Sequence, residues 1–316
     1  MNSPAPSSIS ASRLARALAL AAAALVAIDQ GGGAVLDEAW PRSTANPLVA
    51  PIRAETETLV LGSSTAKRAF DPAALGPRSY NAAEDGQGLF FVAAYLRNLP
   101  ARVPYGRIVL GLDPDEFAAG LASPNTRNLK RLAPYARRDA QLFSEIAIFD
   151  RDLETKLVSG LYPYRGLVAS TLWRWAFPRA RGDGYAPLPG RLAALTPWTP
   201  DGKKPAAMAY PAEAAFRDIV SQAAQRDARL ILVVTPLAGG HRRERDPFYA
   251  PIMAAIRALA PEACDLTRHD DPAIDAIAAD PALYHDTAHL NGAGARRYTE
   301  RVKALIDRHC PPAPPR

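Results

Sequence analysis

Short apolar runs alternate with amphipathic stretches along most of the chain. Residues 59–61, 108–110 and 230–234 are uninterrupted apolar runs, the pattern of strands whose two faces are both covered. Weaker runs lie near Tyr80 and Leu266. We predict five strands, at residues 57–61, 79–82, 107–113, 229–236 and 264–266.

Helical spacing of apolar residues fills the intervals between these strands. We predict helices at residues 89–99, 211–228 and 247–259, and a final helix from Gly292 onward. Strands that alternate with helices are typical of a parallel sheet covered on both faces. The pattern therefore predicts an α/β fold.

Residues 114–205 interrupt this alternation. They hold basic residues such as Arg137 and aromatic residues such as Tyr135 and Trp173, with many prolines and no clean strand. We interpret the region as a mostly helical insertion over one end of the sheet. It would form either a lid or docking face for an acidic polymer, or a solvated basic face above a small satellite core.

The N-terminus predicts export. Arg13 and Arg16 precede an uncharged apolar run at residues 17–28, the pattern of a secretory signal. Residues 32–34 (Gly-Gly-Ala) offer a cleavage site, whereas residues 14–28 offer an uncleaved anchor. We expect the protein in the periplasm, free or anchored in the cytoplasmic membrane.

These observations divide the chain into four parts. Residues 1–34 form a signal peptide or membrane anchor, 35–56 a linker rich in proline, 57–310 the α/β domain and 311–316 a tail. The two cysteines, Cys264 and Cys310, form either one disulfide or two free buried thiols.

The composition is that of a globular protein, with 48% hydrophobic and 22% charged residues among 316. A formal net charge of +6 favours an anionic neighbour, such as a membrane surface or an acidic polysaccharide. No motif predicts nucleic-acid binding or a cofactor.

Candidate chemistry comes from two distant stretches. Asp286 and His289 are three residues apart, so the carboxylate can orient the imidazole as a general base. Ser64 follows the first predicted strand, at the edge where open α/β sheets place reacting groups. Alternatively, His285 and His289 mimic a zinc motif, which requires both on one face of a continuous helix.

These residues resemble the SGNH/GDSL hydrolase superfamily. The resemblance rests on Gly62-Ser63-Ser64 after the first strand and on Asp286-x-x-His289 before the last helix. It implies a flavodoxin-like three-layer α/β/α fold over residues 57–113 and 206–309, and a Ser64–His289–Asp286 triad. The chain is more narrowly similar to exported proteins of exopolysaccharide biosynthesis, including the alginate O-acetyltransferase group.

The resemblance also implies an oxyanion hole. Ser63 stands where the family has Asp, and Gly86, or Gly88 in its place, would supply a backbone N–H. Asp113 stands where the family has an Asn that donates to the oxyanion, and a carboxylate there would repel the developing charge. Gln87 or Lys67 would then be the substitute donor.

The expected function is that of an exported serine esterase or O-acetyltransferase. Its substrate would be an acyl ester, expected to be acetyl groups on a polysaccharide, and its partners other exopolysaccharide biosynthesis proteins. The alternative is a weak or inactive protein of the same fold that binds polysaccharide or assembles an exopolysaccharide complex.

Overall fold

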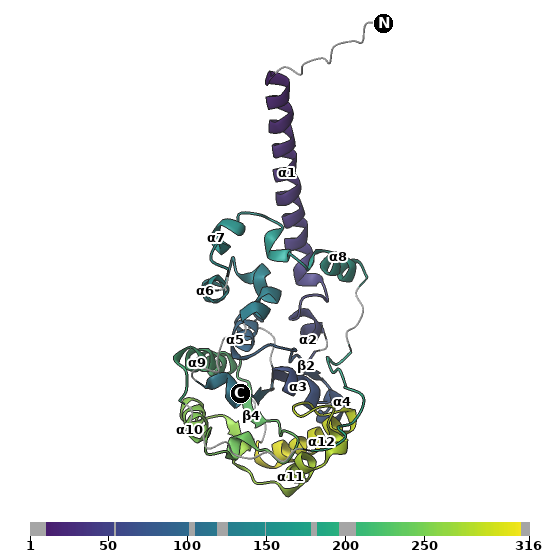
Figure 1. The fold of residues 1–316 in the computed structure, drawn as a ribbon, viewed down its shortest axis with the longest axis vertical. Coiled ribbons are helices and arrows are strands. Elements are labelled where there is room, and N and C mark those ends of the chain that lie inside the picture. Colours follow the sequence, from purple (N-terminus) through teal and green to yellow (C-terminus); the bar gives the residue numbers. More distant parts are fainter. Residues whose placement is uncertain are drawn as a thin grey trace.

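A five-stranded parallel sheet forms the centre of the computed structural model (Figure 1). The structure describes residues 11–53, 55–100, 105–118, 126–148, 150–177, 182–195 and 207–310. The strands are β1 (Thr58–Gly62), β2 (Ser79–Asn81), β3 (Arg107–Leu112), β4 (Arg229–Val234) and β5 (Cys264–Asp265). All five predicted strands are present, in the order β2-β1-β3-β4-β5.

Helices cover both faces of this sheet, because alternate residues of each strand point to opposite sides. Leu59, Ile108 and Leu232 belong to one core, and their neighbours Val60 and Val109 to the other. The first core includes α5 (Leu89–Asn98), α9 (Tyr210–Gln225) and α10 (Ala250–Leu259). The second includes α3 (Ser64–Ala69), α4 (Pro72–Leu75), α11 (Pro272–Ala279) and α12 (Gly292–His309). The predicted α/β class is confirmed.

The described parts of the insertion are mostly helical, as expected. They comprise η2 (Pro114–Phe117), η3 (Thr126–Tyr135), α6 (Ala140–Ala147), α7 (Leu153–Lys156), η4 (Tyr162–Tyr164) and α8 (Val168–Ala176). Leu132 and Leu142 join the main core, whereas Tyr164 packs with Leu36 and Trp40 in a small separate cluster. A satellite core therefore exists, and it is shared with the N-terminal segment.

The N-terminal segment corrects the predicted linker at residues 35–56. Helix α1 (Ala11–Ala39) runs through the three glycines at 31–33, and η1 (Trp40–Arg42) and α2 (Val49–Arg53) follow it. Leu36, Trp40 and Leu48 are each at most 2% exposed, so this segment is part of the folded domain. The prolines were misleading because they lie in short helices and turns packed on the domain.

The first part of α1 projects away from the domain (Figure 1). Among the described residues, the helix over Ala11–Arg42 is the one long and apolar enough to cross a membrane.

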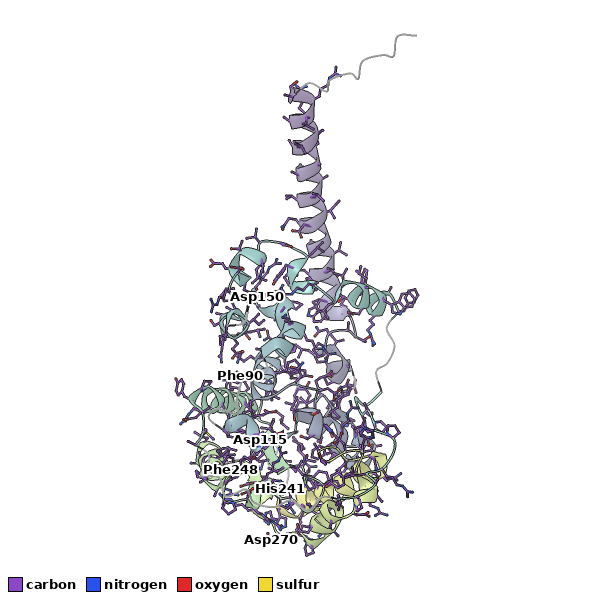
Figure 2. The ribbon with its side chains drawn as sticks, viewed as in Figure 1. Phe90, Asp115, Asp150, His241, Phe248 and Asp270 are labelled. Carbon is purple, nitrogen blue, oxygen red and sulfur yellow. A yellow bond between two sulfur atoms is a disulfide. The ribbon has the colours of Figure 1, made fainter. Side chains whose placement is uncertain are left out.

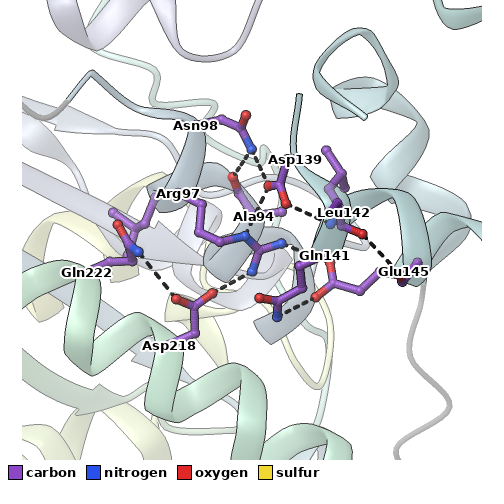
Figure 3. Close-up of polar contacts among 12 residues, drawn as sticks. Ala94, Arg97, Asn98, Asp139, Gln141, Leu142, Glu145, Asp218 and Gln222 are labelled. Carbon is purple, nitrogen blue, oxygen red and sulfur yellow. Dashed lines mark hydrogen bonds and ion pairs between the residues drawn. The ribbon is translucent and has the colours of Figure 1, made fainter. Parts of the chain in front are cut away.

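A largely buried ion cluster fastens the insertion to the sheet's helices (Figure 3). Arg97 of α5 contacts Asp139 before α6 at 3.0 Å, Glu145 within α6 at 3.2 Å and Asp218 of α9 at 2.5 Å. One guanidinium thus joins three helical segments that are far apart in sequence.

The two cysteines form a disulfide, Cys264–Cys310. It links β5 at the edge of the sheet to the C-cap of α12.

Candidate active site

Ser64 lies at the carboxyl end of β1, where the chain turns directly into α3. Ser63 is the N-cap residue and Ser64 the first helical residue. A Cβ at Gly62 would lie 2.8 Å from the Cβ of Ala66, and one at Gly111 would lie 2.5 Å from the same atom. Gly62 also has a φ of 142°, a conformation that suits glycine. These two missing side chains let α3 begin on the sheet and place Ser64 at its edge.

Asp286 and His289 lie on the loop that precedes α12. Tyr284 and Leu290 form an antiparallel bridge across the base of this loop. Asn291 then caps α12 by accepting hydrogen bonds from two backbone N–H groups of the first turn. The loop is therefore fixed to the start of a buried helix.

The three predicted residues meet in space. Ser64 Oγ lies 2.9 Å from His289 Nε2, and His289 Nδ1 lies 2.9 Å from Asp286 Oδ2. With its proton on Nδ1 donating to Asp286, His289 has Nε2 left to accept the hydroxyl proton of Ser64. The side chains of His289 and Asp286 are 24% and 47% exposed, so a solute can reach the site. This is the geometry of an activated serine.

The ionisation of Asp286 suits its position. Burial alone would raise the pKa of Asp286, but hydrogen bonds from the His289 side chain and from the backbone N–H groups of Ala288 and His289 outweigh burial and lower that pKa. The carboxylate therefore stays charged at neutral pH and can stabilise an imidazolium.

Residues 182–195, which we call the strap, lie along the histidine loop. The Leu192 N–H donates to the carbonyl of Tyr284 over 2.7 Å, and the Asn291 side-chain amide donates to the carbonyl of Gly190 over 2.9 Å. At its other end, Arg68 of α3 donates to the carbonyl of Ala186 over 2.6 Å. The strap thus contacts both elements that carry the triad.

A cavity of about 230 Å³ lies between the strap and the carboxyl end of β2. Its lining includes Lys67, Asn81, Glu84, Gly184 and Tyr185. Lys67 is one helical turn from Ser64, and its ammonium lies 2.8 Å from the carboxylate of Glu84. The cavity therefore adjoins the helix that presents the serine.

Asp113 has a cation beside it that the sequence did not reveal. Its carboxylate lies 2.6 Å from Nη1 of Arg243, a side chain that is 4% exposed, and it accepts from the Asp115 N–H. Burial raises the pKa of Asp113, and the Arg243 charge opposes that rise. Figure 2 shows Asp115 and His241, which flank this pair, in the half of the domain far from α1. Asp113 is thus part of an ion pair and not a bare anion.

Gly88 has a structural role that competes with the oxyanion role considered for it. It is the N-cap of α5, and a Cβ there would lie 2.8 Å from a carboxylate oxygen of Glu116. Glu116 accepts from the Leu89 N–H over 2.9 Å. Burial and the charge of nearby Asp113 raise the pKa of Glu116 to about 8.

The other predicted oxyanion residues lie on the same edge of the sheet. Gly86 is in an exposed turn with a φ of 67°, and the neighbouring Gln87 is buried. Glu84 N–H donates to the carbonyl of Gly62, which brings this turn to the end of β1. Ser63 makes no capping hydrogen bond; its hydroxyl lies 3.2 Å from that of Thr65.

The alternative zinc motif requires His285 and His289 on one continuous helix, and the structure does not meet this requirement. Residues 285–289 form a loop, and α12 begins only at Gly292. His285 also turns to the strap, where its Nδ1 lies 2.6 Å from the carbonyl oxygen of Pro189.

The positioning roles of two residues, Asn81 and Arg243, were not predicted from the sequence. Asn81 donates to the carbonyls of Ala66, Lys67 and Phe70, and so ties β2 to the end of α3. Arg243 lies 130 positions from Asp113. Neither has a local motif, because each acts through contacts made only after folding.

The chain matches no known family model, and no curated protein matches it significantly. The geometry of the site therefore carries the functional argument.

Proposed function

We propose that the protein is an exported SGNH-like serine esterase or O-acyltransferase that acts on acetyl groups of a polysaccharide. The observation that carries the proposal is the hydrogen-bonded chain from Ser64 through His289 to Asp286. A serine needs such a base to attack an ester at neutral pH.

The family assignment within this proposal has two supports. Gly62-Ser63-Ser64 and Asp286-x-x-His289 resemble the family's motifs. The strand order 2-1-3-4-5 is that of flavodoxin-like folds, which place ligands outside the carboxyl ends of their strands. Ser64 lies at such an end.

In the first step, His289 Nε2 takes the Ser64 proton as Oγ forms a bond to the acyl carbon. The tetrahedral intermediate then collapses: the bond to the leaving oxygen breaks, and the His289 imidazolium returns the proton to that oxygen. Asp286 stabilises the imidazolium throughout. The products are an alcohol and an acyl group on Ser64.

In the second step, water or a sugar hydroxyl gives its proton to His289 and attacks the acyl carbon. The bond to Ser64 Oγ breaks, and Oγ recovers the proton from His289. Water as acceptor makes the protein an esterase, and a sugar hydroxyl makes it a transferase.

The oxyanion donors in this proposal are the Gly86 N–H and the Gln87 side chain. Asp113 occupies the edge position of the family's Asn, but Arg243 at 2.6 Å balances its charge. An oxyanion at this edge would therefore not meet an uncompensated negative charge.

The alternative is a catalytically inactive protein that binds polysaccharide or assembles an exopolysaccharide complex. Asp113 favours it, because a carboxylate is a poorer oxyanion donor than the amide it replaces. The net charge of +6 suits an acidic polymer in either case.

Labelling by a fluorophosphonate probe tests the proposal. The purified full-length chain should be labelled, and Ser64→Ala and His289→Ala should not be. Asp286→Asn should slow labelling by about 10³–10⁴-fold, because the imidazole would then favour the wrong tautomer.

Two further variants serve as controls. Ser144→Ala removes an exposed hydroxyl bonded only within α6, and should label like the wild type. Ser63→Ala should still be labelled, since the hydroxyl of Ser63 pairs with that of Thr65, whereas His289 Nε2 pairs with Ser64. A folded wild-type protein that resists the probe would favour the inactive alternative.

A further inference from the structure

Exposed large apolar side chains gather on α1 and on the part of the insertion beside it. On α1 they are Leu14, Leu18, Leu20, Leu25, Val26, Ile28 and Val35. In the insertion they are Ile148, Val158, Trp173, Trp175 and Phe177. Across the residues that the structure describes, Tyr210 is the one other such side chain. Scattered apolar residues are ordinary on a surface, whereas a concentration at one end requires a cause.

The exposed part of α1 is slightly shorter than the hydrocarbon core of a bilayer is thick. Every residue from Ala11 to Ile28 is exposed, and at 1.5 Å per residue this stretch is about 27 Å long. The hydrocarbon core of a bilayer is about 30 Å thick. No spare length of helix would therefore separate the domain from the membrane surface.

Immediately after this stretch, α1 docks onto the insertion. The Asp29 carboxylate accepts from the Ser159 hydroxyl over 2.6 Å and from the Gly160 N–H over 2.8 Å. The Gln30 amide donates to the carbonyl of Val158 over 2.9 Å. The loop that carries Val158, which is 75% exposed, thus lies at the level where the apolar stretch ends.

Close backbone packing reinforces this contact. A Cβ at Gly33 would lie 2.5 Å from the Gly160 Cα, and one at Gly160 would lie 2.5 Å from the Asp29 carbonyl oxygen. Gly32 and Gly33, which resemble part of a cleavage site, therefore form a face of α1 that packs against the loop at Gly160. Cleavage there would remove Asp29 and cut the docked helix.

The docked loop is itself fixed. Asp150, labelled beside the lower end of α1 in Figure 2, receives contacts from Lys156, the Tyr162 hydroxyl and Arg165. A loop held in this way keeps Val158 in place.

Helix α8 and its C-cap residue add an aromatic rim: Trp173, Trp175 and Phe177. The rings of Trp173 and Phe177 pack in a tilted pair with centroids 4.6 Å apart, and both side chains are more than half exposed. Figure 1 shows α7 and α8 flanking α1 where it enters the domain. Tryptophan is enriched at the headgroup level of membranes, where its apolar ring and polar N–H are both satisfied.

We propose that α1 is retained as a membrane anchor, and that the Val158 loop and the aromatic rim rest in the headgroup region of the same bilayer. Arg13 and Arg16 place the N-terminus on the cytoplasmic side, so the surface contacted is the periplasmic one. The domain is then held in one orientation. This inference rests on the export assigned above and not on the acyl chemistry.

Quenching by brominated lipid tests the contact. The full-length chain is reconstituted into vesicles of phosphatidylglycerol and phosphatidylcholine brominated near the headgroup end of its acyl chains. Bromine should quench the tryptophan emission, and Trp173→Phe/Trp175→Phe should lose most of that quenching. Trp40→Phe is the matched control: Trp40 is 2% exposed, so its removal should leave the amount of emission that bromine quenches unchanged.

The mass of the protein extracted from membranes tests retention of the anchor. The expected mass includes α1. A soluble product that begins near residue 35 would overturn the proposal. So would an intact chain, retained in vesicles, whose emission bromine does not quench, or a rim found covered by a second copy in cross-linking. Fluorophosphonate labelling of the same samples reports separately on the triad.

Discussion

The carboxylate of Asp113, at the end of β3, has its negative charge balanced by a buried arginine, Arg243. Asp113 alone would place a negative charge at the edge where an oxyanion is proposed to form. Arg243 lies 2.6 Å away and is almost wholly buried, so solvent screens the pair little. The net charge at this edge of the sheet therefore depends on a residue from the loop after another strand, β4.

Substitution of Arg243 should lower kcat more than it weakens substrate binding. In Arg243→Met, the carboxylate of Asp113 loses its counter-charge, and we expect kcat on p-nitrophenyl acetate to fall by about 10²–10³-fold. Adding Asp113→Asn should restore part of the rate, because an amide carries no charge and can donate. Full activity in Arg243→Met would show that Asp113 does not face the reacting atoms.

At the scale of elements, the Arg97 cluster decides how the insertion meets the sheet. Three carboxylates converge on one guanidinium whose side chain is 12% exposed. Burial opposes the charge of Asp139, but the Leu142 N–H and Arg97 outweigh burial and lower its pKa. A lowered folded-state pKa contributes stability above the unfolded value of about 3.9, and this contribution is lost as pH falls through the folded pKa.

Arg97→Met should therefore destabilise the fold by about 3–5 kcal/mol at pH 7, because it leaves buried carboxylates without a partner. The difference from wild type should narrow as the pH falls below about 4, through the lowered folded-state pKa of Asp139, because that carboxylate then takes up a proton. Urea unfolding at several pH values measures both effects. Arg217→Met is the control: it removes an exposed pair on α9 and should cost less than about 1 kcal/mol.

The disulfide likewise joins two elements, β5 and the end of α12. We expect it to affect the stability of the fold more than the candidate site. Cys264 and Cys310 are 46 residues apart in sequence, so closing that loop stabilises the fold by about 3–4 kcal/mol. The bond lies at the C-terminal end of α12, whereas His289 precedes its N-terminal end.

Cys264→Ala/Cys310→Ala should therefore melt at a lower temperature while still accepting the fluorophosphonate probe. A reductant should lower the melting temperature of the wild type and leave that of the double variant unchanged. Equal melting temperatures for the oxidised wild type and the variant would contradict this role.

At the scale of the whole molecule, the N-terminal segment belongs to the domain. Two soluble variants separate its contributions, one that lacks residues 2–28 and one that lacks residues 2–34. The second also loses Asp29 and Gly33, so Ser159 and Gly160 lose their carboxylate partner. We expect it to be less stable by about 1–3 kcal/mol in urea unfolding. Equal stability would mean that residues 29–34 contribute no net stabilisation.

The sequence by itself determined the α/β class and the five strands, and it singled out Ser64, Asp286 and His289, which the structure brings into hydrogen-bond contact. Apolar runs and helical spacing are local signals, because burial on one face or two imposes its own period. Ser64, Asp286 and His289 were identifiable because Ser64 follows the first strand, and because Asp286 and His289 have a three-residue spacing that resembles the SGNH/GDSL motif.

Only the tertiary structure decided the environment of those residues. The Arg243 partner of Asp113, the strap over the histidine loop and the docking of α1 all depend on contacts across long separations. The sequence left the disulfide open and assigned residues 35–56 to a linker, because spacing and proline content do not report distance in space. The local hydrophobic pattern determines which helices and strands form, whereas the packing between these elements determines which groups each side chain contacts.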